Sequence, residues 1–126
     1  MSLKEKYKLL EFKERGDERG KLVAIESLRD IPFEIKRVFY IYGTSSNVVR
    51  GQHANKKSEF VLINLRGGCK VRLYNENEEQ IVVLDKPNIG LYIPKLVWKD
   101  MYDFSPDSLL IAFSNEYYDA NEYLKK

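Results

Sequence analysis

The chain has 126 residues, 44% hydrophobic and 32% charged, which is typical of a globular protein and unlike a disordered one. Its 21 basic and 19 acidic residues leave a formal net charge of +2, which is too small to indicate a general attraction to nucleic acid or to a membrane surface. We expect one domain over residues 1–126, because a second core would leave each half too small to bury enough surface.

Cysteine usage and the N-terminal segment indicate a cytoplasmic protein. The single cysteine, Cys69, cannot form an internal disulfide, and it lies in a segment typical of a strand, so we expect a buried, inert thiol. No apolar run follows the first charged residues, and no stretch approaches the roughly 18 apolar residues of a membrane span. We therefore expect neither a nucleic-acid nor a membrane partner.

Short alternating or β-branched segments, separated by turn residues, predict an all-β fold. The segments also contain many aromatic residues, which favour strands, and a series of such strands suits a barrel or jelly roll. In chain order they are Lys8–Phe12, Lys21–Glu26, Lys36–Tyr42, Phe60–Leu65, Cys69–Tyr74, Gln80–Leu84, Ile89–Ile93 and Leu109–Phe113. Only the C-terminal end looks helical, where Asp119 is a candidate cap for a short helix through Tyr123 and Leu124.

One segment between these strands carries the side chains that can do chemistry. It runs from Arg50 to Phe60 and contains the single histidine, His53, after an Arg-Gly turn. In an extended chain His53 and Asn55 project to the same side, and Arg50 can bind phosphate or carboxylate. A lone histidine is more often a hydrogen-bonded structural residue, so composition alone favours that simpler interpretation.

The same segment resembles the first cupin motif, in which two histidines one residue apart precede a glutamate and a glycine. The corresponding residues here are His53, Asn55, Glu59 and Gly67. A metal-binding cupin needs more histidines than this, and the chain has one. The resemblance implies a double-stranded β-helix barrel, and the missing histidines predict that it holds no metal.

The flanking segments extend the resemblance to the dTDP-4-keto-6-deoxyglucose 3,4-ketoisomerases, the WxcM-like cupins, over roughly residues 8 to 124. The segments that carry it are Arg19–Glu26, Pro32–Tyr40, Arg50–Ala54, Gly90–Pro94, Val97–Trp98, Asp103–Ser105 and Tyr117–Asp119. The resemblance implies a homodimer that moves the keto group of a dTDP-linked sugar from carbon 4 to carbon 3, in pathways that supply amino sugars to surface polysaccharide. It implies no redox cofactor.

The resemblance also assigns roles to residues. His53 is the expected base, with Tyr40 and Tyr42 as hydrogen-bond donors to sugar oxygens and Arg37 and Arg50 as pyrophosphate ligands. The alternative for both arginines is surface ion pairing.

Two positions depart from the family pattern. Asn55 stands where a second histidine is usual, and an amide cannot titrate, so it could only donate a hydrogen bond to the keto oxygen. Trp98 and Lys99 are both expected to bind the substrate or its nucleotide from one pocket wall. Lys99 replaces the usual histidine or arginine and is either a solvated cation or an electrostatic or proton-transferring group. This region, with Arg19, is expected to help choose the face on which carbon 4 is protonated.

Two other functions compete with the 3,4-ketoisomerase. A related sugar-nucleotide epimerase also uses a histidine base in a cupin barrel and would exchange the hydrogen at carbon 5. A binding domain that lost catalysis with its second histidine, at Asn55, would bind dTDP without turning over a keto sugar.

Overall fold

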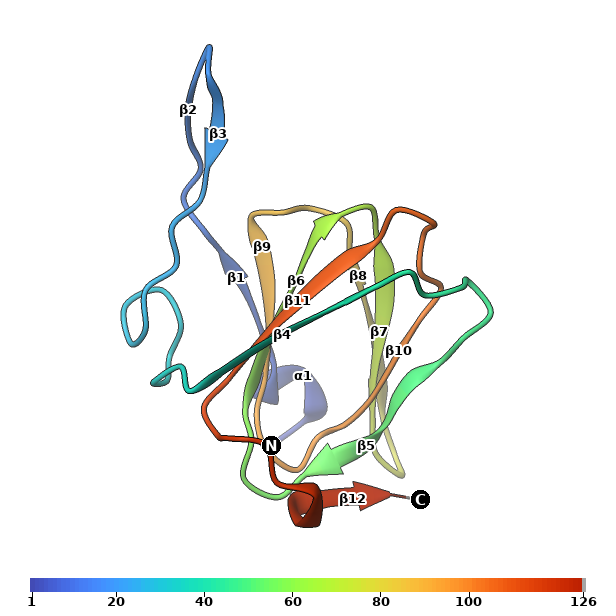
Figure 1. The fold of residues 1–126 in the computed structure, drawn as a ribbon. Coiled ribbons are helices and arrows are strands. Elements are labelled where there is room, and N and C mark those ends of the chain that lie inside the picture. The colour runs from blue at the N-terminus through green and yellow to red at the C-terminus, as the bar shows by residue number, and fades with distance from the viewer. Residues whose placement is uncertain (126) are drawn as a thin grey trace.

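The computed structural model describes residues 1–125 and consists mainly of two five-stranded antiparallel sheets that face each other (Figure 1). The first sheet has the order β1 (Lys8–Glu11), β9 (Ile89–Ile93), β6 (Phe60–Arg66), β11 (Leu109–Ser114) and β4 (Arg37–Tyr42). The second has the order β12 (Tyr123–Lys125), β5 (Arg50–Asn55), β10 (Trp98–Tyr102), β7 (Cys69–Tyr74) and β8 (Glu79–Leu84). A short helix, α1 (Leu3–Lys6), precedes β1.

The strands predicted from alternation are confirmed, except for most of the segment Lys21–Glu26. Only its first residues pair, as β3 (Gly20–Leu22) in a hairpin with β2 (Arg15–Asp17). The rest was predicted wrongly: Val23 and Ile25 pack against the outer face of the first sheet without strand partners. Apolar alternation reports burial of every second side chain, and a loop that lies against a sheet produces the same pattern as a strand.

The predicted C-terminal helix is also a correction. Asp119 does cap a helix, since its side chain accepts a hydrogen bond from the Asn121 N–H at 2.9 Å, but this 3-10 helix, η1, spans only Ala120–Glu122. The chain then continues as β12, which pairs with β5. The residues after Glu122 satisfy their backbone groups in the sheet instead of continuing the helix.

Alternation along the strands divides the apolar side chains into an inner and an outer layer. The inner cluster fills the space between the sheets and includes Leu62, Val71, Leu73, Leu91 and Leu110. The outer cluster lies where the segment between β3 and β4 covers the first sheet, and it includes Phe12, Ile31, Phe33, Val61 and Ile63. Cys69 is buried in the inner cluster, as expected, and burial raises the pKa of its thiol to about 11.

The β2–β3 hairpin projects away from the barrel (Figure 1). Its residues are exposed, and Arg19 pairs with Asp17 at 2.7 Å. The hairpin therefore contributes nothing to the inner core of its own chain.

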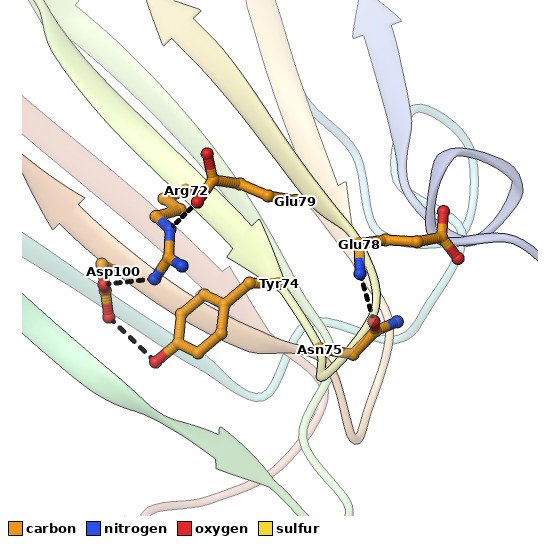
Figure 2. Close-up of polar contacts among 6 residues, drawn as sticks. All are labelled: Arg72, Tyr74, Asn75, Glu78, Glu79 and Asp100. Atoms are coloured by element: carbon orange, nitrogen blue, oxygen red, sulfur yellow. Dashed lines mark hydrogen bonds and ion pairs between the residues drawn. The ribbon is translucent and has the colours of Figure 1, made fainter.

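The second sheet exposes a polar outer face, whose contacts Figure 2 shows. Arg72 pairs there with Glu79 and with Asp100, and the Tyr74 hydroxyl donates to Asp100 at 3.2 Å. The turn after β7 is held by Asn75, whose side-chain oxygen accepts the Glu78 N–H at 2.8 Å. No helix among residues 1–125 is long and apolar enough to cross a membrane.

Candidate active site

A cavity of about 220 Å³ opens between the two sheets and is lined by strands of both. Its lining residues are Arg37, Phe39 and Ile41 of β4, Arg50, Gly51 and His53 of β5, Phe60 and Leu62 of β6, Lys99 and Met101 of β10, and Tyr123 of β12. The wall thus combines an apolar floor with a few charged side chains, which is the usual composition of a small-molecule site.

An irregularity in β5 brings Arg50 and His53 to the same cavity. The pairing with β10 shifts register, so that Lys99 lies opposite His53 whereas Asp100 lies opposite Gly51. Gly51 and Gln52 have positive φ angles of 88° and 59°. A β-bulge re-aims side chains in this way, and here two residues three positions apart line one cavity. The glycine is needed, because a Cβ at position 51 would lie 2.9 Å from the Lys99 carbonyl oxygen.

His53 is held as a neutral imidazole with a defined tautomer. Its Nδ1 lies 3.0 Å from the carbonyl oxygen of Gly51, and a carbonyl only accepts, so Nδ1 carries the proton and Nε2 keeps a free lone pair. Burial lowers the pKa of His53 below its ordinary value, and the charge of Lys99 lowers it further. Near neutral pH the site therefore presents an unprotonated nitrogen that can accept a proton.

Lys99 is a buried cation next to this histidine. Its side chain is 3% exposed, and its Nζ donates a hydrogen bond to the Asn55 Oδ1 at 3.0 Å. Because an ammonium has no acceptor, this contact also fixes which end of the Asn55 amide faces Lys99. The Phe60 ring lies under the ammonium, 4.5 Å from Nζ to the centroid. Burial lowers the pKa of Lys99 to about 8, although Glu122 opposes the shift.

Glu122 supplies the negative charge behind Asn55. Its carboxylate accepts the backbone N–H groups of Ser58 and Lys57 at 2.9 and 3.1 Å, as well as the Ser58 hydroxyl. Burial alone would raise the pKa of Glu122, but these hydrogen bonds and the Asn55 side chain lower it overall. The carboxylate therefore stays ionised and joins the loop between β5 and β6 to the C-terminal segment.

Two arginines give the cavity a positive rim. Arg37 packs its guanidinium over the rings of Phe39 and Tyr118, at 4.6 and 5.1 Å. Its buried Nη1 has no hydrogen-bond partner among residues 1–125. A buried donor of this kind is costly unless it meets an acceptor, and an anionic ligand supplies one. Arg50 lines the cavity from β5.

Four of the residues predicted for the site do not line the cavity. Tyr40 and Tyr42 alternate with Phe39 and Ile41, so β4 points them outward, where they are 63% and 71% exposed and stack on each other. Trp98 alternates with Lys99 and packs against Tyr74 on the outer face of the second sheet.

Arg19, the last of these four, is on the projecting hairpin and does not line the cavity of its own chain.

Other wall residues were not predicted from the sequence. Phe60 lies on the same face of β6 as the core residue Leu62, and Met101 lies on the same face of β10 as Lys99. Alternation along each strand could therefore have identified both residues. Tyr123, whose ring centroid is 4.7 Å from that of His53, belongs to a three-residue strand with too little pattern to detect. Glu122 has no sequence signal that separates it from surface glutamates.

The residues around His53 do not fit a transition-metal site of the cupin type. His53 is the single histidine of the sequence, and the side chains nearest to it in the cavity include the ammonium of Lys99, which is not a metal ligand while it is protonated. Within residues 1–125, no three histidine, cysteine, aspartate or glutamate side chains gather closely enough to hold a metal ion. The cavity is suited to anions and to proton transfer.

The fold and the cavity define a cupin-type barrel, and comparison with known proteins agrees. The crystal structure of QdtA, a sugar 3,4-ketoisomerase from Thermoanaerobacterium thermosaccharolyticum in complex with TDP, superposes with a TM-score of 0.94 at 43% identity, covering 96% of this chain and 88% of that one. The TDP-fucose-3,4-ketoisomerase WlaRA from Campylobacter jejuni gives 0.89 at 40% identity, covering 95% and 89%. The predicted jelly-roll barrel is thus confirmed.

Sequence comparison identifies the family within this class. The family description FdtA: WxcM-like, C-terminal matches residues 5–126. The TDP-4-oxo-6-deoxy-α-D-glucose-3,4-oxoisomerase of Aneurinibacillus thermoaerophilus is 45% identical over 119 residues, which are 94% of this chain and 86% of that protein. The chain belongs to the FdtA, WxcM-like family, and the predicted family is confirmed.

A 3,5-epimerase, RmlC from Legionella pneumophila, superposes with a TM-score of 0.78 at 18% identity, which is a likeness of fold alone.

Proposed function

We propose that the chain is a sugar-nucleotide 3,4-ketoisomerase that acts on a TDP-linked 4-keto-6-deoxy sugar and moves the keto group from carbon 4 to carbon 3. The observation that carries the proposal is that His53 lines the cavity as a neutral imidazole whose Nε2 can accept a proton. The 45% identical relative is a TDP-4-oxo-6-deoxy-α-D-glucose-3,4-oxoisomerase, which supports the reaction, and the TDP complex of QdtA supports the nucleotide.

The reaction needs a proton acceptor and a stabilised oxyanion. Removal of the hydrogen at carbon 3 yields an enediolate, and return of a proton at carbon 4 yields the 3-keto sugar. His53 is the base, because a neutral imidazole accepts protons near neutral pH. The positive charges of Arg37, Arg50 and Lys99 stabilise the developing negative charge in a partly desolvated cavity.

Binding of the nucleotide involves the arginines at the rim. Arg37 keeps a buried donor without a partner in the described chain, and the diphosphate of TDP is an acceptor of the right charge. A cavity of about 220 Å³ suits the sugar ring rather than the entire sugar nucleotide, so the nucleoside extends outward past these arginines.

The wider setting of the enzyme is part of the same proposal. We expect a cytoplasmic homodimer in which no nucleic acid takes part, supplying 3-amino deoxysugars for surface polysaccharide. Arg19, Tyr40 and Tyr42 are exposed in one chain, so the roles proposed for them at a sugar nucleotide require a second copy.

The test is to incubate the protein with TDP-4-keto-6-deoxyglucose in deuterated buffer and to follow the sugar by proton NMR. A 3-keto product with deuterium at carbon 4, absent in His53→Asn, is the expected result. Deuterium entering carbon 5 instead would identify an epimerase. Binding of TDP with no turnover, together with activity in Asn55→His, would identify a binding protein and refute the proposal.

A further inference from the structure

The described cavity holds a second side chain that can exchange a proton, on the strand opposite His53. We propose that Lys99, positioned by Asn55, is the second proton-transferring residue of the site and delivers the proton to carbon 4 of the sugar while His53 removes the one at carbon 3. The inference rests on the proposed function and adds to it a division of work between two residues.

The first argument is the register of the two strands. Lys99 on β10 and His53 on β5 are direct antiparallel partners, and both line the cavity. Side chains directly opposite each other on one face of a sheet start from Cβ atoms about 5 Å apart. A sugar ring beside this pair can therefore present one ring carbon to the imidazole and the neighbouring carbon to the ammonium.

The second argument is that Asn55 fixes the position of the ammonium. Asn55 is 1% exposed, and its backbone is held on two sides, by the pairing with Tyr123 and by the Leu96 N–H, which donates to the Asn55 carbonyl at 2.7 Å. Its Oδ1 takes one of the three N–H donors of Lys99, and the Phe60 ring lies against the ammonium. The Lys99 side chain is thus restrained beside the cavity.

The third argument is the charge around Lys99. The charged or titratable side chains near it are Arg37 of β4, Arg50 and His53 of β5, Glu122 of η1 and Tyr123 of β12. The carboxylate of Glu122 lies behind Asn55 and is already bound by Ser58. No carboxylate of residues 1–125 pairs directly with Lys99, and burial brings its pKa to about 8, low enough for the amine to give up a proton near neutral pH.

The step balances without any other reactant. The C3–H bond breaks and its proton goes to Nε2 of His53, while its electron pair forms the C3=C4 bond and the carbonyl pair moves to O4. The hydroxyl proton on O3 then passes to O4, a carbonyl forms at C3, and the C3=C4 pair takes a proton from Nζ of Lys99. The imidazolium and the neutral amine that remain restore each other by proton exchange, directly or through solvent.

Two variants separate this role from charge stabilisation. Lys99→Arg keeps the positive charge but cannot give up a proton at neutral pH, and Lys99→Met removes the charge. In deuterated buffer we expect Lys99→Arg to form the 3-keto product at least about 100-fold more slowly, the lower range for loss of a general acid. The substrate recovered from Lys99→Arg should still gain deuterium at carbon 3, because His53 is intact.

The outcomes distinguish this inference from the proposed function. Absence of both exchange and product in the unsubstituted chain would refute the proposed function itself. Product formation by Lys99→Arg within about tenfold of the unsubstituted rate would instead overturn the role of Lys99 alone, since a general acid contributes more than that. Loss of TDP binding by both Lys99 variants, measured by calorimetry, would also overturn it, because Lys99 would then be needed for the fold or for binding.

The role of Asn55 has its own readout. Asn55→Asp places a carboxylate against the Lys99 ammonium and raises the pKa of Lys99, so the decline of kcat on the alkaline side should move to higher pH. Asn55→Leu removes the acceptor and should lower kcat while TDP still binds. An alkaline limb that stays in place in Asn55→Asp would overturn the assignment of Asn55 as the positioning residue.

Discussion

His53 and Lys99 are direct partners across the β5–β10 ladder, one a neutral imidazole and the other a buried ammonium. The two groups are coupled, because the charge of Lys99 disfavours a second charge on His53 and contributes to its lowered pKa. The coupling keeps His53 unprotonated at pH values where an isolated histidine would begin to charge.

The pKa of His53 can be measured directly, since the sequence contains one histidine and its ring gives one set of NMR signals. We expect a titration midpoint below the ordinary value of 6.5, as burial and Lys99 both favour the neutral ring. Lys99→Met should raise this midpoint. Lys125→Met is the matched control and should raise it by less, since Lys125 is the weaker of the two cationic neighbours. A midpoint unchanged in Lys99→Met would contradict the coupling.

The pH dependence of kcat follows from the two proposed roles. His53 must be neutral, so activity should rise with pH with a midpoint below the ordinary histidine value of 6.5, because the pKa of His53 is lowered by burial and by Lys99. Lys99 must carry its proton, so activity should fall again as the pH passes about 8. A bell-shaped profile of this kind, measured in the unsubstituted chain, should lose its alkaline limb only when Lys99 is replaced. A profile that stays flat from pH 7 to about 10 would contradict an acid with a pKa of about 8, because only a group that keeps its proton over this range, such as a lysine with an ordinary pKa near 10.4, would give it.

Much of the barrel and part of the cavity could be predicted from the sequence, because each depends on local alternation. The strands from β6 to β9 follow it, and His53 was found from its place after an Arg-Gly turn. Side-chain direction was harder to predict. Tyr40 and Tyr42 were expected at the sugar, but they occupy the outward positions of β4.

The contacts that join distant segments could not be predicted. Nothing local to Asn55 reveals that Lys99 lies 3.0 Å away, or that Glu122 closes the network from the C-terminal segment. In the sequence alone, Asn55 in place of a family histidine leaves a loss of catalysis open as an alternative. The structure gives the amide a different partner, and this pairing is a long-range property of the fold.

Glu122 should stabilise the fold as an ionised carboxylate. Glu122→Gln replaces two acceptor oxygens by one and leaves a backbone or hydroxyl donor of Ser58 or Lys57 unsatisfied, at a cost of about 1–3 kcal/mol in the free energy of unfolding. Because the folded pKa of Glu122 is lowered, its contribution is present above the unfolded pKa of about 4.3 and is lost as the pH falls through the folded value.

Urea unfolding of Glu122→Gln and of the unsubstituted chain at pH 7 and pH 3 measures this difference, which should shrink at the lower pH. Glu116→Gln is the control for the loss of a carboxylate outside this network. A difference that grows at pH 3 would contradict the sign of the pKa shift.

The bulge at Gly51 should be needed for the active geometry and not only for stability. In Gly51→Ala the new Cβ would meet the Lys99 carbonyl oxygen at 2.9 Å, so β5 and β10 must move apart where His53 and Lys99 face each other. Gly43→Ala is the matched control: Gly43 also has a positive φ angle, 70°, but a Cβ there meets nothing within 4 Å. Both variants should lose about 1 kcal/mol of unfolding free energy from backbone strain. Only Gly51→Ala should also lower kcat, by tenfold or more, because a displacement of about 1 Å can cost a positioned catalytic group about 100-fold in rate. Equal kcat values for the two variants, measured on folded protein, would show that the register of the bulge does not set the geometry of the site.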